Sequence, residues 1–308
     1  MYDKSDPRSA LNAPTATPKP APTTFAGAEY GHFHADAPQV DDADGRTWLT
    51  RGQNFLVAYT EARPGAVFSR IDQPDEYVAL LPNRDTAATV SAGSDTVSSD
   101  GYALIVVPPG DSAVTLPEGG ILVRIFSTVA ADLAAAASNA ASYADQHPNV
   151  PAFEPWPEPA GGYRLRAYSL DVPDEPGRFG RIWRTTNLMV NFLPPQLGPR
   201  DIHKLSPHYH DDFEQGSLAL EGSFTHHLRW PWTFDMTQWR ADEHALCPAP
   251  SLCVIPPPAI HTSRGMEPGV NQLVDIFSPP RIDFSLKPGW VLNADDYPMP
   301  APAAAAAE

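Results

Sequence analysis

The sequence of 308 residues has little cysteine and few basic side chains. Its two cysteines, Cys247 and Cys253, exclude a disulfide framework, and we expect both to be free thiols packed in the protein. The 21 Lys and Arg residues stand against 37 Asp and Glu residues, which gives a net charge of −16. Because a surface this negative repels phosphate groups, nucleic acid and anionic membranes are poor partners.

Long apolar runs are also missing. No stretch approaches the ~20 apolar residues that a membrane-spanning helix needs, and the polar start at residues 1–24 does not have the pattern of a secretory signal. We therefore expect a cytoplasmic protein. The chain is rich in proline instead, with 36 prolines and 20 glycines between short runs of Val, Ile, Leu and Phe. This pattern favours many short strands and predicts an all-β fold.

An internal repeat divides the chain into two strand-rich halves, because three segments of the first half return in the same order in the second. The pairs are 70–76 with 208–214, 106–109 with 254–257, and 122–127 (LVRIFS) with 273–278 (LVDIFS). We predict two antiparallel barrels, over residues 41–128 and 181–297. The alternative is one continuous sandwich with accidental similarity between its halves.

The remaining segments have simpler compositions. The connector, residues 129–180, begins with an Ala-rich stretch that predicts a helix over Ala130–Gln146. Residues 1–40 are predicted to form a flexible N-terminal arm, and residues 298–308 a disordered Ala/Pro tail.

The second half contains side chains suited to a metal ion. His208 and His210 are separated by one residue, so on a strand their imidazoles point to the same face. Glu214 follows three residues later, and His261 comes after a proline-rich turn. Three neutral nitrogens and one carboxylate suit one divalent Fe, Mn, Ni, Co or Zn ion. The alternative is that these histidines are core or surface residues without an ion.

These residues resemble the motifs of the cupin superfamily. The segment His208-x-His210-x3-Glu214-x7-Gly222 is similar to the first cupin motif, and Pro257-Pro258-x2-His261 with Asn271 is similar to a loosened second motif. The chain departs from the family pattern by one extra residue before Gly222 and by Pro258 where glycine is common. The resemblance covers most of both halves. It implies two tandem cupin barrels, the double-stranded β-helix or jelly-roll fold, joined by the Ala-rich helix.

The first half does not repeat the ligand set. Arg70, Asp72, Glu76 and Ala113 occupy the matching positions. An arginine and an alanine cannot complete a transition-metal site. We therefore predict a metal site only in the C-terminal barrel and a structural role for the N-terminal barrel.

About ten residues are inserted between the two motifs of the second half, in a region rich in titratable side chains. On a strand over 223–229, His227 and Arg229 share one face. His227 is a candidate general acid or base, and Arg229 a candidate ligand for a substrate carboxylate or phosphate. Glu243 and His244 are further candidates for proton transfer. The alternative is that this polar face points to solvent while the Phe/Leu face forms the core.

Together, the ligand set and the resemblance predict a metal-dependent enzyme that acts on a small, oxygen-rich hydroxy or oxo metabolite, with or without a carboxylate. A metal with open positions polarises a carbonyl and acidifies the neighbouring C–H bond, which permits redox-neutral isomerase or lyase chemistry. The resemblance to two-barrel cupins with the metal in the C-terminal barrel implies this chemistry. The first alternative is an Fe(II)-dependent dioxygenase, and the second is a non-catalytic binding protein. We expect a small-molecule substrate, and dimers would form through barrel edges.

Overall fold

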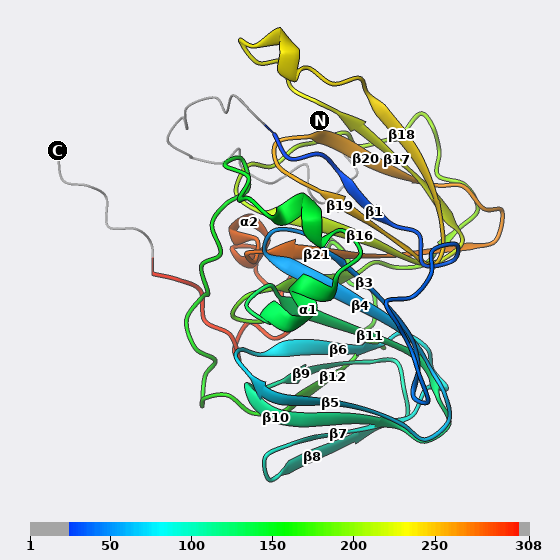
Figure 1. The fold of residues 1–308 in the computed structure, drawn as a ribbon, viewed down its shortest axis with the longest axis vertical. Coiled ribbons are helices and arrows are strands. Elements are labelled where there is room, and N and C mark those ends of the chain that lie inside the picture. Colours follow the sequence, from blue (N-terminus) through cyan, green and yellow to red (C-terminus); the bar gives the residue numbers. More distant parts are fainter. Residues whose placement is uncertain (1–24, 302–308) are drawn as a thin grey trace.

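The computed structural model describes residues 25–301, which form two barrels stacked along the long axis of the molecule (Figure 1). The predicted all-β fold with two tandem double-stranded β-helices is confirmed. The helical segments are short: α1 (Ala131–Ala136), η2 (Ala140–Tyr143), η3 (Met236–Gln238) and α2 (Ile282–Ser285).

The N-terminal barrel is built from one large and one small antiparallel sheet. The large sheet has the order β12 (Arg166–Ser169), β9 (Ala103–Val107), β6 (Tyr77–Leu81), β11 (Gly120–Ser127), β4 (Phe55–Ala62), β3 (Gly45–Arg51) and β2 (Val40–Asp41). The small sheet has the order β5 (Ala66–Gln73), β10 (Gly110–Leu116), β7 (Ala88–Ala92) and β8 (Asp95–Ser99).

The C-terminal barrel repeats this arrangement. Its large sheet has the order β1 (Glu29–Gly31), β19 (Ser251–Ile255), β16 (Glu214–Glu221), β21 (Val270–Ser278), β14 (Met189–Phe192) and β13 (Arg181–Arg184), and β15 (Gln196–Leu197) also pairs with β21. Its small sheet has the order β18 (Glu243–Pro248), β17 (Ser223–Arg229) and β20 (Ile260–Gly265).

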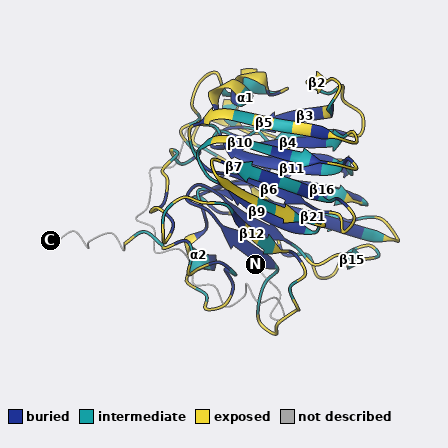
Figure 2. Ribbon diagram, turned by 90° about the horizontal axis from the view of Figure 1, so that it is seen from below, coloured by how far each residue is buried: buried dark blue, intermediate teal, exposed yellow. Residues whose placement is uncertain are grey.

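The two large sheets pack face to face and form the central core. On β11, Val123 and Ile125 belong to this shared core, while Leu122 and Phe126 face the interior of the N-terminal barrel. Strands such as β6 and β9 are therefore buried on both faces, and their residues are dark blue in Figure 2. Burial on both faces explains why these strands are continuous apolar runs instead of alternating ones.

Each barrel receives a strand from the segment that precedes the other barrel. Strand β1 lies before the N-terminal barrel in sequence but pairs with β19, with Tyr30 opposite Cys253. Strand β12 lies before the C-terminal barrel but pairs with β9, with Arg166 opposite Val106. The prediction of a flexible arm is therefore wrong for residues 25–40, and residues 1–24 lie outside the described residues. The predicted tail is described only as far as residue 301.

The predicted helix Ala130–Gln146 is wrong in length. Helix α1 ends at Ala136, and Ala137 takes an extended conformation. The backbone N–H of Ser138 then donates to Leu49 O, and the Asn139 side chain bonds both the N–H and the carbonyl of Arg51. These contacts with β3 outweigh the helix propensity of the alanines, because propensity is a weak preference that tertiary bonds override.

Both cysteines are buried and free, as predicted. Helices of the length and apolar character needed to cross a lipid bilayer do not occur within residues 25–301.

A buried carboxylate from each barrel binds a turn of the other. Glu214, at the start of β16, accepts hydrogen bonds from the backbone N–H groups of Gln53 (3.0 Å) and Asn54 (3.2 Å). Glu76, just before β6, accepts from the N–H of Thr186 (2.6 Å) and from the Tyr297 hydroxyl (3.1 Å). The two turns correspond in the repeat, since each follows an arginine and contains an asparagine in the pattern Arg-x-x-Asn.

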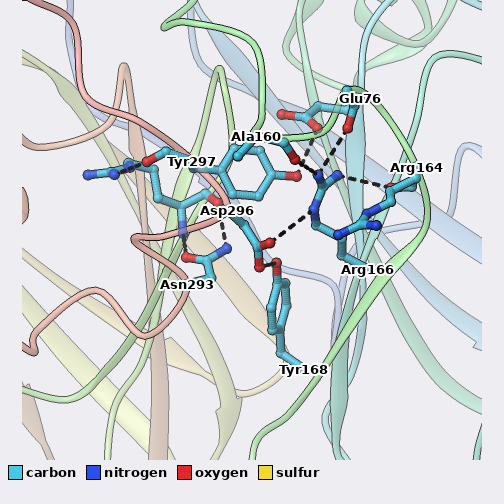
Figure 3. A network of polar contacts seen from close by, with 10 residues as sticks. Glu76, Ala160, Arg164, Arg166, Tyr168, Asn293, Asp296 and Tyr297 are labelled. Atoms are coloured by element: carbon cyan, nitrogen blue, oxygen red, sulfur yellow. Dashed lines mark hydrogen bonds and ion pairs between the residues drawn. The ribbon is translucent and has the colours of Figure 1, made fainter.

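The contact at Glu76 belongs to a larger polar network, shown in Figure 3. Tyr168 on β12 donates to Asp296 at 2.7 Å, and Arg166 on the same strand lies 3.6 Å from the other carboxylate oxygen of Asp296. Arg166 also donates to Ala160 O at 2.7 Å. The exchanged strand, the connector and the C-terminal segment are thus bonded together beside Glu76.

We predict that Glu76→Ala lowers the free energy of unfolding by about 2–4 kcal/mol, because it leaves the Thr186 N–H and the Tyr297 hydroxyl buried without an acceptor. Urea unfolding followed by tryptophan fluorescence measures the loss. The control is Glu61→Ala, which removes a half-exposed ion pair with Arg46 and should cost less than about 1 kcal/mol. Equal losses in the two variants would show that the inter-barrel carboxylate is not a major stabilising contact.

Candidate metal centre in the C-terminal barrel

Three predicted ligands, His208, His210 and His261, gather inside the C-terminal barrel. His208 and His261 form an antiparallel bridge, in which each backbone N–H donates to the carbonyl of the other at 3.1 and 2.8 Å. The ring centroids of His208 and His210 lie 4.5 and 5.0 Å from that of His261. His210 also stacks on Phe213 at 3.9 Å, which holds its ring against the barrel wall.

The three imidazoles share one hydrogen-bonding arrangement. The Nδ1 atoms of His208, His210 and His261 lie 3.0, 2.8 and 2.9 Å from the carbonyl oxygens of Ser206, Phe213 and Ala259. A carbonyl only accepts, so each Nδ1 carries the proton and each neutral ring keeps a lone pair on Nε2. Burial, with smaller contributions from His261 and Arg281, holds the pKa of His210 well below its ordinary value. The rings are therefore oriented as metal ligands commonly are, with a backbone acceptor on the other nitrogen.

Gln215 supplies an oxygen to this group. Its Oε1 lies 3.3 Å from Nε2 of both His210 and His261. Its amide nitrogen donates to Ser217 Oγ at 3.1 Å and to Asp275 Oδ1 at 3.3 Å, which turns the oxygen toward the histidines. With neutral rings, no proton lies between these acceptor atoms, and their convergence favours a cation. The donors present therefore fit a divalent ion of the borderline type.

Glu214, the predicted fourth ligand, does not point toward the three histidines, because its carboxylate binds the turn of the N-terminal barrel. Successive residues of a strand point to opposite faces, so Glu214 faces the turn of the N-terminal barrel while Gln215 faces the interior. The turn has room for the carboxylate because Gly52 has no side chain: a Cβ there would lie 2.3 Å from Glu214 Oε2. Burial raises the pKa of Glu214 to about 7, although the two backbone N–H groups act in the opposite direction.

The sequence contained a signal for this arrangement. One residue too many separates Glu214 from Gly222, and the usual spacing is restored when Gln215 takes the ligand position. Among residues 25–301, no group of three or more His, Cys, Asp or Glu side chains already stands in an arrangement that holds a metal ion. The donor set of this barrel is unusual because its oxygen comes from a neutral amide.

A cavity of about 270 Å³ adjoins the cluster. Its lining includes His208, His261 and Gln215, the apolar side chains Phe179, Leu193, Phe224 and Leu273, and the polar side chains Arg200, Ser206, Ser263, Asn271 and Asp275. Arg200 donates to Ser263 O and to Ser206 Oγ, both at 2.9 Å, which fixes its guanidinium at the wall. Asp275 accepts from Ser217 Oγ at 2.9 Å beside Gln215. The cavity thus places one cationic and one anionic side chain near the imidazoles.

The predicted catalytic residues do not line this cavity. His227 and His244 contact each other across β17 and β18, with their Nδ1 atoms 2.8 Å apart on the exposed face. On the same face, Arg229 forms an exposed ion pair with Asp242. Glu243 accepts from the Tyr30 hydroxyl at 2.8 Å and from Trp230 Nε1 at 2.9 Å.

The two faces of β17 differ in burial. Phe224, His226 and Leu228 are buried, whereas His227 and Arg229 lie on the more exposed face. There they line a second pocket of about 160 Å³ with His244 and His261. His226 was missed by sequence reasoning: it is 1% exposed, and its Nδ1 lies 2.8 Å from Ser263 Oγ at the cavity wall. Burial lowers the pKa of His226 to about 3, so the ring is neutral at physiological pH.

The N-terminal barrel has other side chains at the equivalent places. Arg70 pairs with Ser112, as His208 pairs with His261, so the residue that matches His261 is Ser112 and not the predicted Ala113. Tyr77 takes the place of Gln215 at the start of β6, and its hydroxyl lies 3.1 Å from Ser112 Oγ. The equivalent group thus consists of a guanidinium and two hydroxyls, with no imidazole.

Neither a family model nor a curated protein sequence matches this chain. Solved structures do resemble it. They include an oxalate decarboxylase of Lactobacillus farciminis in a formate complex, with 13% identity, a TM-score of 0.52 and coverage of 84% of this chain and 89% of that chain. AerE from Microcystis aeruginosa has 9% identity, a TM-score of 0.53 and coverage of 78% and 94%. The Momordica charantia 7S globulin has 12% identity, a TM-score of 0.52 and coverage of 82% and 84%.

The fold is that of a two-barrel cupin. At these identities the likeness describes the architecture, and a binding or catalytic role has to be argued from the residues of this chain.

We predict that His226 makes the protein less stable as the pH falls. The pKa of His226 is about 3 in the folded protein and near 6.5 when unfolded, so the unfolded chain binds the extra proton between these values. Between pH 7 and pH 5, wild type should lose about 2 kcal/mol relative to His226→Leu, because the unfolded wild-type chain gains a proton at residue 226 that the folded protein does not bind. Urea unfolding at the two pH values measures this. A pH-independent difference would contradict the prediction.

Proposed function

We propose that this protein is a metal-dependent enzyme that carries out redox-neutral chemistry on a small hydroxy- or oxo-carboxylate. The observation that supports it most directly is the convergence of Nε2 of His210 and His261 on Gln215 Oε1 beside a cavity with a fixed guanidinium. His208, His210, Gln215 and His261 would hold the ion, an Fe, Mn, Ni, Co or Zn dication. A bound dication supplies a Lewis acid that polarises a substrate carbonyl.

The neutral donor set favours anionic substrates. Three imidazoles and one amide leave the positive charge of a dication uncompensated, whereas a glutamate ligand would cancel part of it. A substrate carboxylate or enolate would then supply the missing negative charge. The cavity volume of about 270 Å³ suits a small metabolite, since pockets for drug-sized ligands are generally larger.

Arg200 is the proposed substrate-binding residue. Its guanidinium is fixed by Ser263 O and Ser206 Oγ at the cavity wall, on the segment that leads into His208. A planar guanidinium binds a carboxylate through two parallel hydrogen bonds, which orients the substrate as well as holding it. Arg200 thereby takes the role that Arg229 was predicted to have.

Asp275 is the proposed proton acceptor. It contributes a carboxylate to the cavity wall, next to Gln215. A carboxylate in this position can take a proton from the carbon beside the polarised carbonyl and return it to a neighbouring carbon, which is an isomerisation without net redox change. Ser217, which donates to Asp275 at 2.9 Å, would keep this carboxylate oriented.

The metal-binding part of the proposal predicts a specific ranking of variants. In titrations of metal-free protein with Mn, Co, Ni or Zn, wild type should bind one ion, and His208→Ala, His261→Ala and Gln215→Ala should each weaken binding by roughly tenfold or more. Glu214→Gln and Arg70→Ala should retain wild-type affinity, because neither side chain belongs to the donor group. Loss of the ion in Glu214→Gln but not in Gln215→Ala would reverse the ligand assignment.

The chemical part predicts carbon–hydrogen exchange. In D2O, metal-loaded wild type should catalyse deuterium incorporation next to the carbonyl of a responsive 2-oxo- or 2-hydroxycarboxylate, observed by proton NMR across a panel. Asp275→Asn should lose at least about a hundredfold in exchange rate while retaining the ion. Arg200→Met should raise KM for carboxylates.

Oxygen uptake measured on the same panel separates the alternatives. Substrate-dependent oxygen consumption by Fe-loaded protein would establish the dioxygenase alternative instead. Binding without exchange or oxygen uptake would leave a non-catalytic ligand-binding protein.

A further inference from the structure

The repeat places opposite charges at the centres of the two barrels. The segment LVRIFS on β11 and its copy LVDIFS on β21 differ by Arg124 in the first and Asp275 in the second. On β11, alternate residues face the shared core, so Arg124 faces the barrel interior with Leu122 and Phe126. The C-terminal barrel therefore has the carboxylate of Asp275 where the N-terminal barrel has the guanidinium of Arg124.

Arg124 is buried without a partner. It is 8% exposed, and its Nε has no hydrogen-bond acceptor. The other buried arginines within residues 25–301 each donate at least one hydrogen bond: Arg166, Arg181, Arg184 and Arg281. Of the five buried arginines within residues 25–301, Arg124 is the one whose side chain has neither a hydrogen bond nor an ion pair.

The contacts that Arg124 does make do not compensate for its burial. Its guanidinium carbon lies 4.8 Å from the ring centroid of Phe68 and 5.9 Å from that of Phe126. Such cation–π contacts return less free energy than removing a guanidinium from water costs. Burial lowers the pKa of Arg124 to about 10, with nearby Arg70 acting in the same direction, so the group still carries its charge at neutral pH.

The groups that act on Arg124 include the Tyr77 hydroxyl and the Arg70 guanidinium. The Tyr77 hydroxyl stands 3.1 Å from Ser112 Oγ, and whichever of the two donates to the other leaves one hydroxyl proton for a third group. Arg70 faces the same interior, and its guanidinium already binds both oxygens of Asp132 on α1, at 2.7 and 2.9 Å. The Asp132 carboxylate already neutralises Arg70. The charge of Arg124 is therefore left without a counter-ion.

We propose that the N-terminal barrel binds a small organic carboxylate at Arg124, in the place equivalent to the metal-side centre. The guanidinium would pair with the two carboxylate oxygens, and the Tyr77–Ser112 hydroxyl pair would donate the remaining proton. A planar carboxylate matches both the planar fork of arginine and the flat faces of Phe68 and Phe126. The two barrels would then bind opposite charges, a cation in one and an anion in the other.

The test is isothermal titration of the full chain with acetate and with oxalate at constant ionic strength, together with thermal unfolding at the same concentrations. Wild type, Arg124→Met, Arg200→Met and the double variant are compared, since Arg200 marks the cavity of the other barrel. Arg200→Met should bind a carboxylate that the double variant Arg124→Met/Arg200→Met does not bind, and Arg124→Met alone should lose this site while it keeps the one at Arg200. At about 100 times the dissociation constant of the Arg124 site, the melting temperature of Arg200→Met should rise by roughly 5 °C, and that of the double variant Arg124→Met/Arg200→Met should not rise.

Folding of the key variant is checked by its own stability. Replacing an unpaired buried charge by an apolar side chain of similar length should leave the melting temperature without carboxylate unchanged or higher. Arg124→Lys, which keeps the charge but not the fork, should bind about tenfold more weakly than wild type.

Three results would overturn the proposal. The first is equal carboxylate binding by wild type and Arg124→Met, with loss only in Arg200→Met, which would leave the substrate site of the other barrel intact. The second is no binding by any of the proteins. The third is an equal melting shift with chloride and with acetate, which would rule out recognition of the carboxylate group.

Discussion

The packing of the two large sheets against each other is the constraint on which the rest of the structure depends. It buries both faces of strands such as β6 and β19, and it places alternate residues in the shared core and inside a barrel. Because of this alternation, a shift of one position along a strand would place a charged side chain in the shared core instead of inside a barrel. The carboxylates Glu76 and Glu214 reinforce this arrangement, because each accepts backbone hydrogen bonds from a turn of the opposite barrel. The candidate metal centre lies directly beside one of these contacts, one residue along β16.

Much of the architecture could be predicted from the sequence, because the two halves share apolar runs and turn residues in the same order, and this repeat can be recognised without coordinates. The order of the repeated segments predicted two barrels, and proline content predicted short strands. The exchange of β1 and β12 could not be predicted, since pairing between distant residues leaves no local pattern: Tyr30 and Cys253 are some 220 positions apart, and Arg166 and Val106 are 60 apart. The helix was overextended for a related reason: alanine propensity is local, whereas the bonds of Asn139 to β3 are not.

In the candidate site, too, some residues could be placed from the sequence and others could not. Spacing indicated that His208, His210 and His261 lie together, although the His-x-His pair is not on a strand: His208 forms an isolated bridge with His261, and His210 lies in the loop before β16. At Glu214 a carboxylate was preferred to the neighbouring amide, although the distance to Gly222 favoured Gln215. On β17 the pattern Phe-x-His-x-Leu offered two faces. Sequence alone could not decide between them, because either face contains a histidine.

The reciprocal exchange of β1 and β12 has a consequence for how this chain is made and modified. The N-terminal barrel is completed by a strand translated after its own last strand, and the C-terminal barrel by a strand translated before its partner barrel. A chain cut between β11 and β12 would separate each barrel from an edge strand and expose unpaired backbone at two sheet margins. Gene fusions, circular permutations and truncations that treat the halves as independent modules would therefore yield fragments prone to associate with one another.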